Sequence, residues 1–167
     1  MVRTVAEIDW SRWAAKERAT LLFVIRGSRI LLIHKKRGFG KGKINGPGGK
    51  IEPGETPLAC ALRETEEELC IRPRNVREAG ELCFQFTDGH SIHGFVFTAS
   101  DYEGTPQETD EAVPLWFPLD ALPFDRMWED DPTWFPHMLA GRRFLGRYVF
   151  EGDRMLDARV ETFPGNR

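Results

Sequence analysis

Residues 48–71 read GGKIEPGETPLACALRETEEELCI, and this stretch predicts the helix around which the rest of the chain folds. Thr56 followed by Pro57 is a typical helix start, because the hydroxyl caps the first turn and proline suits the first helical position. Three leucines then recur at helical spacing and indicate one apolar stripe: Leu58, Leu62 and Leu69. We therefore expect a helix over residues 56–69 that packs through this stripe.

The same helix carries a cluster of acidic side chains. Glu64, Glu67 and Glu68 are spaced i, i+3 and i+4, which predicts one shared face roughly opposite the leucines. Like charges one turn apart cost a few tenths of a kcal/mol in an isolated helix. Carboxylate oxygens that converge from a rigid helix are the ligands that a hard cation such as magnesium requires. The cluster favours a magnesium site completed by a phosphate-bearing substrate, and the alternative is an acidic face that only contacts water.

The composition is that of one ordinary globular domain. The chain has 167 residues, of which 41% are hydrophobic and 29% are charged, and its formal net charge is -3. This charge gives no general attraction to nucleic acid polymers or anionic membranes. The three cysteines are odd in number and lack metal-ligand spacing, which indicates a reducing compartment. Without a signal-peptide pattern or an apolar run near the roughly 20 residues that span a bilayer, we expect a cytoplasmic protein.

Apolar runs bounded by turn residues predict a strand-rich chain with two main helices. The second helix is expected over residues 131–140, before Gly141. Strands are expected over residues 19–25, 29–34, 76–87, 92–98, 113–117, 144–150 and 155–162. This pattern predicts the α+β class with a mixed sheet. Residues 1–18 are expected to form an N-terminal arm or helix that docks on the domain or contacts a second copy, and residues 19–167 to form a single domain.

Fixed spacings in the opening stretch match one family signature. Gly49 is followed after five residues by Glu55, and after seven more by RETEEELCI at residues 63–71. This pattern resembles the Nudix box of the Nudix hydrolases, and the resemblance implies an α/β/α sandwich around a central mixed β-sheet. Two positions depart from it, because Thr65 replaces a usual aliphatic residue and Cys70 a usual glycine. A non-glycine residue costs about 1 kcal/mol in the left-handed conformation that ends such a helix.

The resemblance also implies which groups bind the metal and act in hydrolysis. The predicted ligands of Mg²⁺, with Mn²⁺ as the alternative ion, are the carbonyl oxygen of Gly48 and the carboxylates of Glu64, Glu67, Glu68 and Glu111. Either Glu67 or Glu64 is expected to be the general base, and the sequence does not choose between them. Arg63 is expected to pair with Glu55 and to orient the site rather than to transfer a proton. Glu111 stands in an acidic loop, so a solvated turn is the alternative to metal binding or water activation.

Segments outside the box extend the resemblance to one subgroup of the family, the oxidised purine nucleoside triphosphatases. They read KKRGFG at residues 35–40, FQF at residues 84–86 and MWEDDPTWFP at residues 127–136. The resemblance implies that the base is bound by Phe39, Asn45, Phe84, Trp128, Asp130 and Asp131. The triphosphate is expected to meet Lys35, with Lys36 and Arg37 as further sources of positive charge.

Asp130 and Asp131 could recognise a base through hydrogen bonds. Two adjacent carboxylates in an apolar aromatic pocket cannot easily both stay ionised. One protonated and one ionised acid would supply a hydrogen-bond donor and an acceptor to an oxidised purine. The alternatives are that Asp131 only caps a helix and that Trp128 belongs to the core, as we expect for Trp134 and Phe135.

These features predict a magnesium-dependent pyrophosphohydrolase that converts oxidised purine nucleoside triphosphates, such as 8-oxo-dGTP, to the monophosphate and pyrophosphate in nucleotide-pool sanitation. One alternative is a Nudix hydrolase of other nucleoside triphosphates or of dinucleoside polyphosphates. Another is a catalytically silent nucleotide-binding sensor, although a silent site has no need to keep the full set of carboxylates. The expected partner is a nucleoside triphosphate, with no nucleic acid polymer and no membrane, and the expected assembly is a monomer or a weak homodimer.

Overall fold

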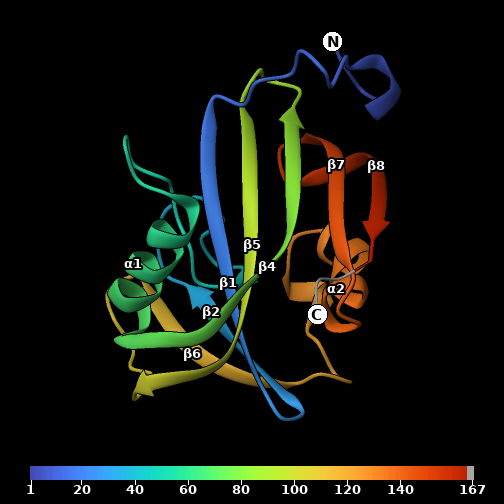
Figure 1. Cartoon of the computed structure of the whole chain (residues 1–167). Helices are drawn as coiled ribbons and strands as arrows, with labels where there is room; N and C mark the ends of the chain where they lie inside the picture. The colour runs from blue at the N-terminus through green and yellow to red at the C-terminus, as the bar shows by residue number, and fades with distance from the viewer. Residues whose placement is uncertain (165–167) are drawn as a thin grey trace.

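In the part of the chain that the structure describes, residues 1–164, an eight-stranded mixed β-sheet carries a helix on each face (Figure 1). The structure is a computed structural model. The helices are α1 (Pro57–Leu69) and α2 (Asp131–Leu139). The strands are β1 (Glu17–Arg26), β2 (Arg29–Lys35), β3 (Ile44–Asn45), β4 (Ile71–Phe86), β5 (Ser91–Gly104), β6 (Ala112–Pro118), β7 (Arg143–Glu151) and β8 (Arg154–Phe163). Neither helix within these residues combines the length and the apolar character needed to cross a membrane.

The sheet contains both parallel and antiparallel pairs. Its order is β3-β2-β1-β5-β4-β7-β8, and β6 pairs with β2. β1 is parallel to β5 and β4 is parallel to β7, whereas β1–β2, β4–β5 and β7–β8 are antiparallel. The expected hairpins at both ends of the chain are present, and the predicted α+β class with a mixed sheet is confirmed.

Apolar side chains that alternate along β1 contribute to the hydrophobic core on both faces of the sheet. Leu22 and Val24 pack beneath α1. Phe23 points to the other face, where its ring centroid lies 5.8 Å from that of Trp134 and 5.1 Å from that of Phe135 in α2. Successive side chains of a strand point to opposite faces, so one strand ties both helices to the sheet. The predicted sandwich and the predicted core positions of Trp134 and Phe135 are confirmed.

The hairpin of β4 and β5 is longer than predicted. β4 starts at Ile71, directly after α1, instead of at residue 76, and β5 continues to Gly104 instead of ending at residue 98. The first half of β4 exposes most of its side chains and contains Pro73, so its sequence lacks the alternation of a half-buried strand. Backbone pairing holds it in place, with Ile71 opposite Gly104.

Helix α1 begins and ends as predicted, and the predicted apolar stripe is confirmed in part, because Leu69 is buried and Leu62 packs against the same core. The Thr56 hydroxyl accepts a hydrogen bond from the N–H of Ala59 at 3.1 Å, and Cys70 ends the helix in the left-handed conformation with φ 61°. The predicted leucine stripe is wrong at Leu58, which is 44% exposed. Small side chains let another side of the helix lie close to β1. That buried side consists of Cys60, Ala61, Thr65, Glu68 and Leu69.

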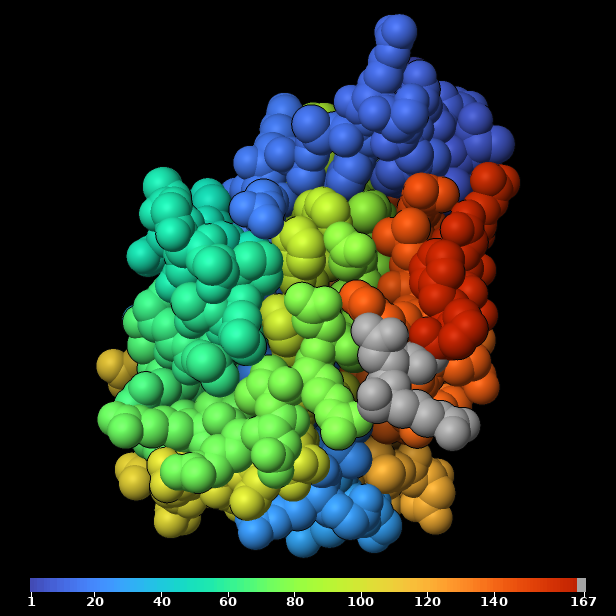
Figure 2. Space-filling model, viewed as in Figure 1, coloured from blue at the N-terminus to red at the C-terminus, as the bar shows by residue number. Residues whose placement is uncertain are grey.

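The N-terminal arm, residues 1–16, docks on the sheet of its own domain, which is one of the two arrangements expected for it. Figure 2 shows the arm in blue, lying over the ends of the red and orange strands β7 and β8. Val5 is buried, and its N–H donates to Oδ2 of Asp157 in β8 at 2.7 Å. Trp13 donates from Nε1 to Oε1 of Gln85 in β4 at 2.9 Å. The arm therefore joins strands from the middle and the edge of the sheet.

Candidate active site

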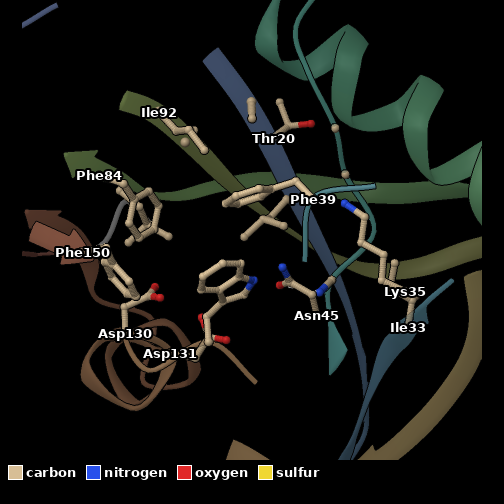
Figure 3. Close-up of a pocket in the computed structure, with 18 of the residues that line it drawn as sticks. Thr20, Ile33, Lys35, Phe39, Asn45, Phe84, Ile92, Asp130, Asp131 and Phe150 are labelled. Carbon is tan, nitrogen blue, oxygen red and sulfur yellow. Dashed lines mark hydrogen bonds between the residues drawn. The ribbon is translucent and has the colours of Figure 1, made fainter. Parts of the chain in front are cut away.

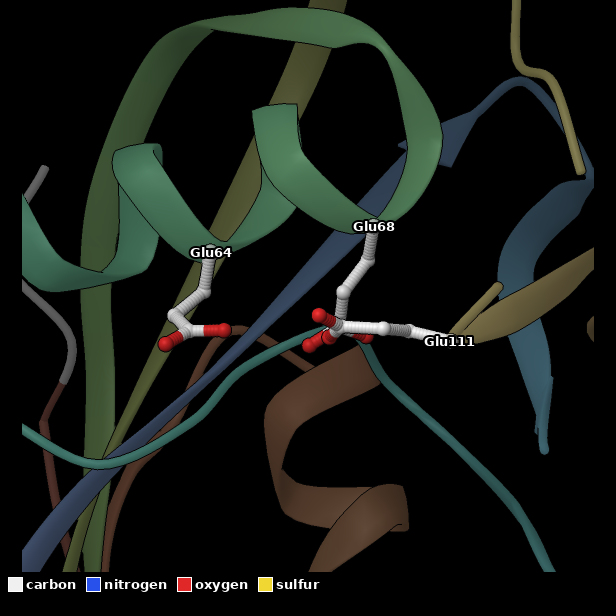
Figure 4. A group of neighbouring side chains, drawn as sticks. All are labelled: Glu64, Glu68 and Glu111. Carbon is white, nitrogen blue, oxygen red and sulfur yellow. The ribbon is translucent and has the colours of Figure 1, made fainter. Parts of the chain in front are cut away.

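Three carboxylates meet between α1 and the start of β6 (Figure 4). Oxygens of Glu64, Glu68 and Glu111 all lie within 4.8 Å of one another, and we call these residues the carboxylate cluster. Glu68 is only 3% exposed, and the side chain of Glu64 is 14% exposed. The predicted acidic face opposite the apolar stripe is therefore wrong, because α1 turns Glu68 into the protein.

Burial makes negative charge in the cluster costly. It raises the pKa of Glu68 from its ordinary value of 4.5 to about 8, with the charge of Glu64 as the next largest cause. Burial also raises the pKa of Glu64, against the opposing effect of Arg63. A divalent cation with oxygen ligands would favour the ionised forms of all three carboxylates. The donor set and its unbalanced charge fit the metal ion that the sequence predicts.

Glycine at residues 48 and 49 leaves space beside the cluster. A Cβ atom on Gly49 would lie 2.5 Å from Cδ of Glu64, and a Cβ atom on Gly48 would overlap with the backbone carbonyl of Thr20. Any other residue would push this segment away from α1 or β1. The two glycines are therefore required by close packing around the carboxylates.

Backbone pairing with β1 holds the segment around Gly48 in place. The N–H groups of Thr20 and Leu22 in β1 donate to the carbonyl oxygens of Gly49 and Pro47, each at 2.9 Å. The N–H of Gly48 donates to Oε1 of Glu68 in the carboxylate cluster at 3.4 Å. The role of the Gly48 carbonyl oxygen as a metal ligand stays a prediction.

Arg63 connects the turn before α1 to the cluster. Its Nε and Nη2 donate to the two carboxylate oxygens of Glu55 at 2.7 and 3.0 Å, so the predicted pair is present and bidentate. Its Nη1 donates to Oε1 of Glu64 at 3.0 Å. The Arg63 guanidinium lowers the pKa of Glu55 to about 2. Arg63 therefore holds one carboxylate of the cluster in a defined orientation.

Glu67 lies beside this network rather than in the cluster. Its side chain is 50% exposed and accepts hydrogen bonds from Nη1 of Arg63 at 3.3 and 3.4 Å. The i+3 spacing from Glu64 turns Glu67 outward, whereas the i+4 spacing turns Glu68 inward. The three helix glutamates therefore differ in burial, and the metal-binding and base roles of Glu67 stay predictions.

Contacts from the segment after β2 bring Glu111 to the cluster. Its carbonyl oxygen accepts a hydrogen bond from the N–H of Lys36 at 2.9 Å, and its carboxylate accepts one from Nη2 of Arg37 at 3.0 Å. Lys36 also donates from Nζ to Glu108 at 2.8 Å. The acidic loop is thus held by basic residues instead of forming a merely solvated turn.

Figure 3 shows a cavity of the protein, whose volume is about 140 Å³. The cavity adjoins the carboxylate cluster, since Glu68 belongs to its lining. It collects every residue predicted for substrate binding: Lys35, Phe39, Asn45, Phe84, Trp128, Asp130 and Asp131. The rings of Phe39 and Trp128 stack, with centroids 5.1 Å apart and planes at 20°. Phe84 stacks on Tyr148 with centroids 5.3 Å apart. A planar base could stack on the ring faces that these partners leave free.

Two buried aspartates face this aromatic cavity. Asp130 and Asp131 are 2% and 3% exposed. Asp130 accepts a hydrogen bond at Oδ2 from Nε1 of Trp134 at 2.9 Å, whereas Oδ2 of Asp131 has no partner within residues 1–164. Asp130 occupies the cap position of α2 without a side-chain capping bond, and Asp131 lies inside the helix, so the cap alternative for Asp131 is wrong.

Burial raises the pKa of both aspartates, and the second-largest effect on the pKa differs between them. The hydrogen bond from Trp134 favours the ionised form of Asp130. The neighbouring charge of Asp130 raises the pKa of Asp131 further. The pair therefore favours one ionised acid, Asp130, beside one protonated acid, Asp131.

Comparison with known proteins agrees with this geometry. Residues 15–138 match the family model described as NUDIX domain. The chain belongs to the Nudix hydrolase family. It is 46% identical over 136 residues to the oxidized purine nucleoside triphosphate hydrolase of Danio rerio, covering 80% of this chain and 86% of that protein. It is 40% identical over 133 residues to the protein of the same name from Mus musculus, covering 79% and 85%.

Solved structures confirm the Nudix fold. The mutator MutT protein from Bacillus halodurans superposes on this Nudix hydrolase with a TM-score of 0.78 at 28% identity, and the match covers 87% of this chain and 97% of that one. The predicted family and the predicted α/β/α sandwich are therefore confirmed.

The basic residues after β2 of this Nudix hydrolase do not act together. Lys35 lines the cavity, whereas Lys36 and Arg37 are engaged with the acidic loop. Asn45 lines the cavity as well, and its Oδ1 accepts a hydrogen bond from the N–H of Gly46 at 2.8 Å, which leaves the amide NH₂ to act as a donor. Of the three basic residues, Lys35 is the one that faces substrate space.

Sequence reasoning missed part of the cavity lining. Thr20, Phe86 and Phe150 also line it. A signal existed for Thr20, because a lone hydroxyl interrupts the apolar run of β1. Phe86 follows the predicted Phe84 by two residues, so strand alternation places both on one face, whereas Phe150 carried no such signal.

Proposed function

We propose that this Nudix hydrolase converts oxidised purine nucleoside triphosphates, with 8-oxo-dGTP as the preferred example, to the monophosphate and pyrophosphate in nucleotide-pool sanitation. The observation that carries the proposal is a pair of buried aspartates in an aromatic cavity whose lining includes Glu68 of the carboxylate cluster. A nucleotide whose base binds at the two aspartates would place its phosphates beside the carboxylate cluster. The names of the Danio rerio and Mus musculus relatives support the same substrate class.

We propose Mg²⁺ as the metal ion, with Mn²⁺ as the alternative. The groups that would hold it are the carboxylates of Glu64, Glu67, Glu68 and Glu111 and the carbonyl oxygen of Gly48. When bound, such an ion neutralises phosphate charge and makes water a stronger nucleophile. Arg63 keeps Glu64 oriented through the hydrogen bond at 3.0 Å. Hydrolysis also requires a general base, and the candidates are Glu64 and Glu67, both of which contact Arg63.

Base selection would depend on the two aspartates acting as a donor and an acceptor. Asp130, which accepts a hydrogen bond from Trp134, can accept another from the base. Asp131, protonated and with an unpartnered Oδ2, can donate to a base carbonyl or ring nitrogen. A proton that moves between the two acids would let one cavity accept oxidised guanine or oxidised adenine. Stacking on Trp128 would add an attraction that every purine shares.

The test is to compare release of pyrophosphate from 8-oxo-dGTP and dGTP in magnesium. We expect kcat/KM to be clearly higher for the oxidised nucleotide. Equal and slow hydrolysis of both would reject the specificity, and a panel of other nucleoside triphosphates and dinucleoside polyphosphates would then identify the preferred substrate. Tight nucleotide binding without any product would instead support a silent sensor.

Variants of the helix test the proposed metal and base roles. Glu67→Gln and Glu64→Gln should each abolish turnover while leaving the circular dichroism spectrum unchanged. Glu66→Gln is the matched control, because Glu66 is exposed and pairs with Arg72 at 3.2 Å outside the cluster. Full activity of Glu67→Gln would remove Glu67 from the site. The cytoplasmic location and the monomeric or weakly dimeric state stay predictions.

A further inference from the structure

Lys43 contacts Trp128, the proposed base-stacking ring. Its ammonium nitrogen lies 4.9 Å from the centroid of the Trp128 ring. A cation over the face of a tryptophan is attracted by the π-electrons of the ring. Trp128 lines the cavity, whereas Lys43 is not part of the lining found in residues 1–164. Lys43 can therefore influence a bound base only through Trp128.

A second contact holds the Lys43 ammonium in this place. Its Nζ lies 3.4 Å from Oδ2 of Asp153, in the turn between β7 and β8. The start of β8, directly after this turn, is tied to the Trp128 segment, because Glu129 accepts a hydrogen bond at Oε1 from the N–H of Met155 at 2.9 Å. An exposed ion pair contributes little on its own. Here it orients an ammonium group that already has an aromatic partner.

The loop that carries Lys43 closes around the edge of the same ring. Phe39 stacks on Trp128, and a Cβ atom on Gly40 would lie 3.2 Å from Nε1 of Trp128. Gly40 has φ 82° and Gly42 has φ 89°, values that side-chain-bearing residues rarely adopt. The loop therefore contacts Trp128 through Phe39 and Lys43, and Lys43 supplies the charged contact.

We propose that Lys43, held by Asp153, is a positioning residue that fixes the orientation of Trp128 for stacking on the base. This inference rests on the proposed function, because it takes Trp128 as the stacking ring. A ring that is already oriented loses less conformational freedom when the base binds. A cation–π attraction at a partly exposed site corresponds to about a two- to fivefold change in an equilibrium constant. The change should appear in binding and not in the chemical step, since Lys43 has no contact with the carboxylate cluster.

The first test is the substitution Lys43→Met, which keeps an unbranched side chain and removes the charge. We expect KM for 8-oxo-dGTP to rise about two- to fivefold with kcat unchanged. Affinity for 8-oxo-dGMP, measured by tryptophan fluorescence in chelator, should fall by the same factor. Lys43→Arg should restore both values, because a guanidinium also stacks on aromatic rings. Lys41→Met is the matched control, since Lys41 lies in the same loop and is exposed.

A double-mutant cycle tests the role of Asp153. Asp153→Asn should weaken binding in the same direction but less, and the double variant should be no weaker than Lys43→Met alone, because Asp153 acts through Lys43. Unchanged affinity of Lys43→Met for 8-oxo-dGMP, or a fall in kcat without a change in KM, would overturn the positioning role. Failure of the proposed function would look different, because the wild-type enzyme itself would not prefer 8-oxo-dGTP over dGTP. The same variants would then be compared on the monophosphate of whichever nucleotide the wild type hydrolyses.

Discussion

Replacing Glu68 with glutamine should stabilise the metal-free protein at neutral and alkaline pH, although it removes a proposed metal ligand. The pKa of Glu68 is raised from 4.5 to about 8, mainly by burial. The folded protein therefore holds this proton more tightly than the unfolded chain does. The stability associated with Glu68 is fully present below pH 4.5 and is lost as the pH rises through about 8.

The magnitude follows from the difference between the folded and unfolded pKa. Each pKa unit corresponds to about 1.4 kcal/mol, so the interval from 4.5 to about 8 sets an upper limit of about 4–5 kcal/mol on the free energy of unfolding lost over that range. Glu68 is 3% exposed, so bulk water screens its charge little. A small shift of α1 or entry of water would relieve part of the cost, so the expected loss is about half this limit. Glutamine has a similar size and no proton to lose.

Urea unfolding in chelator between pH 6 and 9 measures this effect. The wild-type free energy of unfolding should fall with pH relative to that of Glu68→Gln. Glu67→Gln is the matched control and should follow the wild type, because the Glu67 side chain is 50% exposed. Added Mg²⁺ should stabilise the wild type at pH 8 and have little effect on Glu68→Gln. Parallel pH profiles for wild type and Glu68→Gln in chelator would refute the reasoning, since the Glu68 charge would then cost nothing.

Three other substitutions test separate features of the structure. Cys70→Gly should raise the free energy of unfolding by about 0.5 kcal/mol in thermal melts, because glycine adopts the left-handed conformation without strain but adds entropy to the unfolded chain; a lower stability would contradict this. Trp134→Phe should cost about 1–3 kcal/mol in urea unfolding, because Oδ2 of Asp130 loses its buried donor; a neutral change would mean that this bond is unimportant. Asp131→Asn supplies a permanent donor in place of a shared proton, so the ratio of kcat/KM for oxidised guanine and oxidised adenine triphosphates should change. An unchanged ratio would argue against proton sharing.

The parts of the site that obey local rules were predictable from the sequence. Thr56 caps α1 through a residue three positions away, and Cys70 takes the left-handed conformation that its place at the helix end requires. Arg63 and Glu55 are eight positions apart, and their pairing follows from a turn that leads directly into the helix. Such features need only the backbone of one short segment, so the residue pattern is enough to predict them.

Features set by distant packing were not predictable in the same way. The inward turn of Glu68 depends on how closely α1 approaches the segment at Gly48, which only the folded sheet determines. The contact between Lys43 and Asp153 joins residues 110 positions apart. The outer half of the β4–β5 hairpin exists because its backbone finds a partner strand, and not because its side chains alternate. These contacts lack a local pattern, and each emerges only from the three-dimensional arrangement.

The docked arm has a consequence for the edge of the sheet. β8 is the last strand of the described sheet, so its outer backbone groups are able to recruit a strand from another molecule. Val5 engages Asp157 of that strand and places the beginning of the chain against it. A chain trimmed beyond Val5 would lose this hydrogen bond to the Asp157 carboxylate. The arm therefore fastens the end of an edge strand that, in the described sheet, has a backbone partner on one side alone.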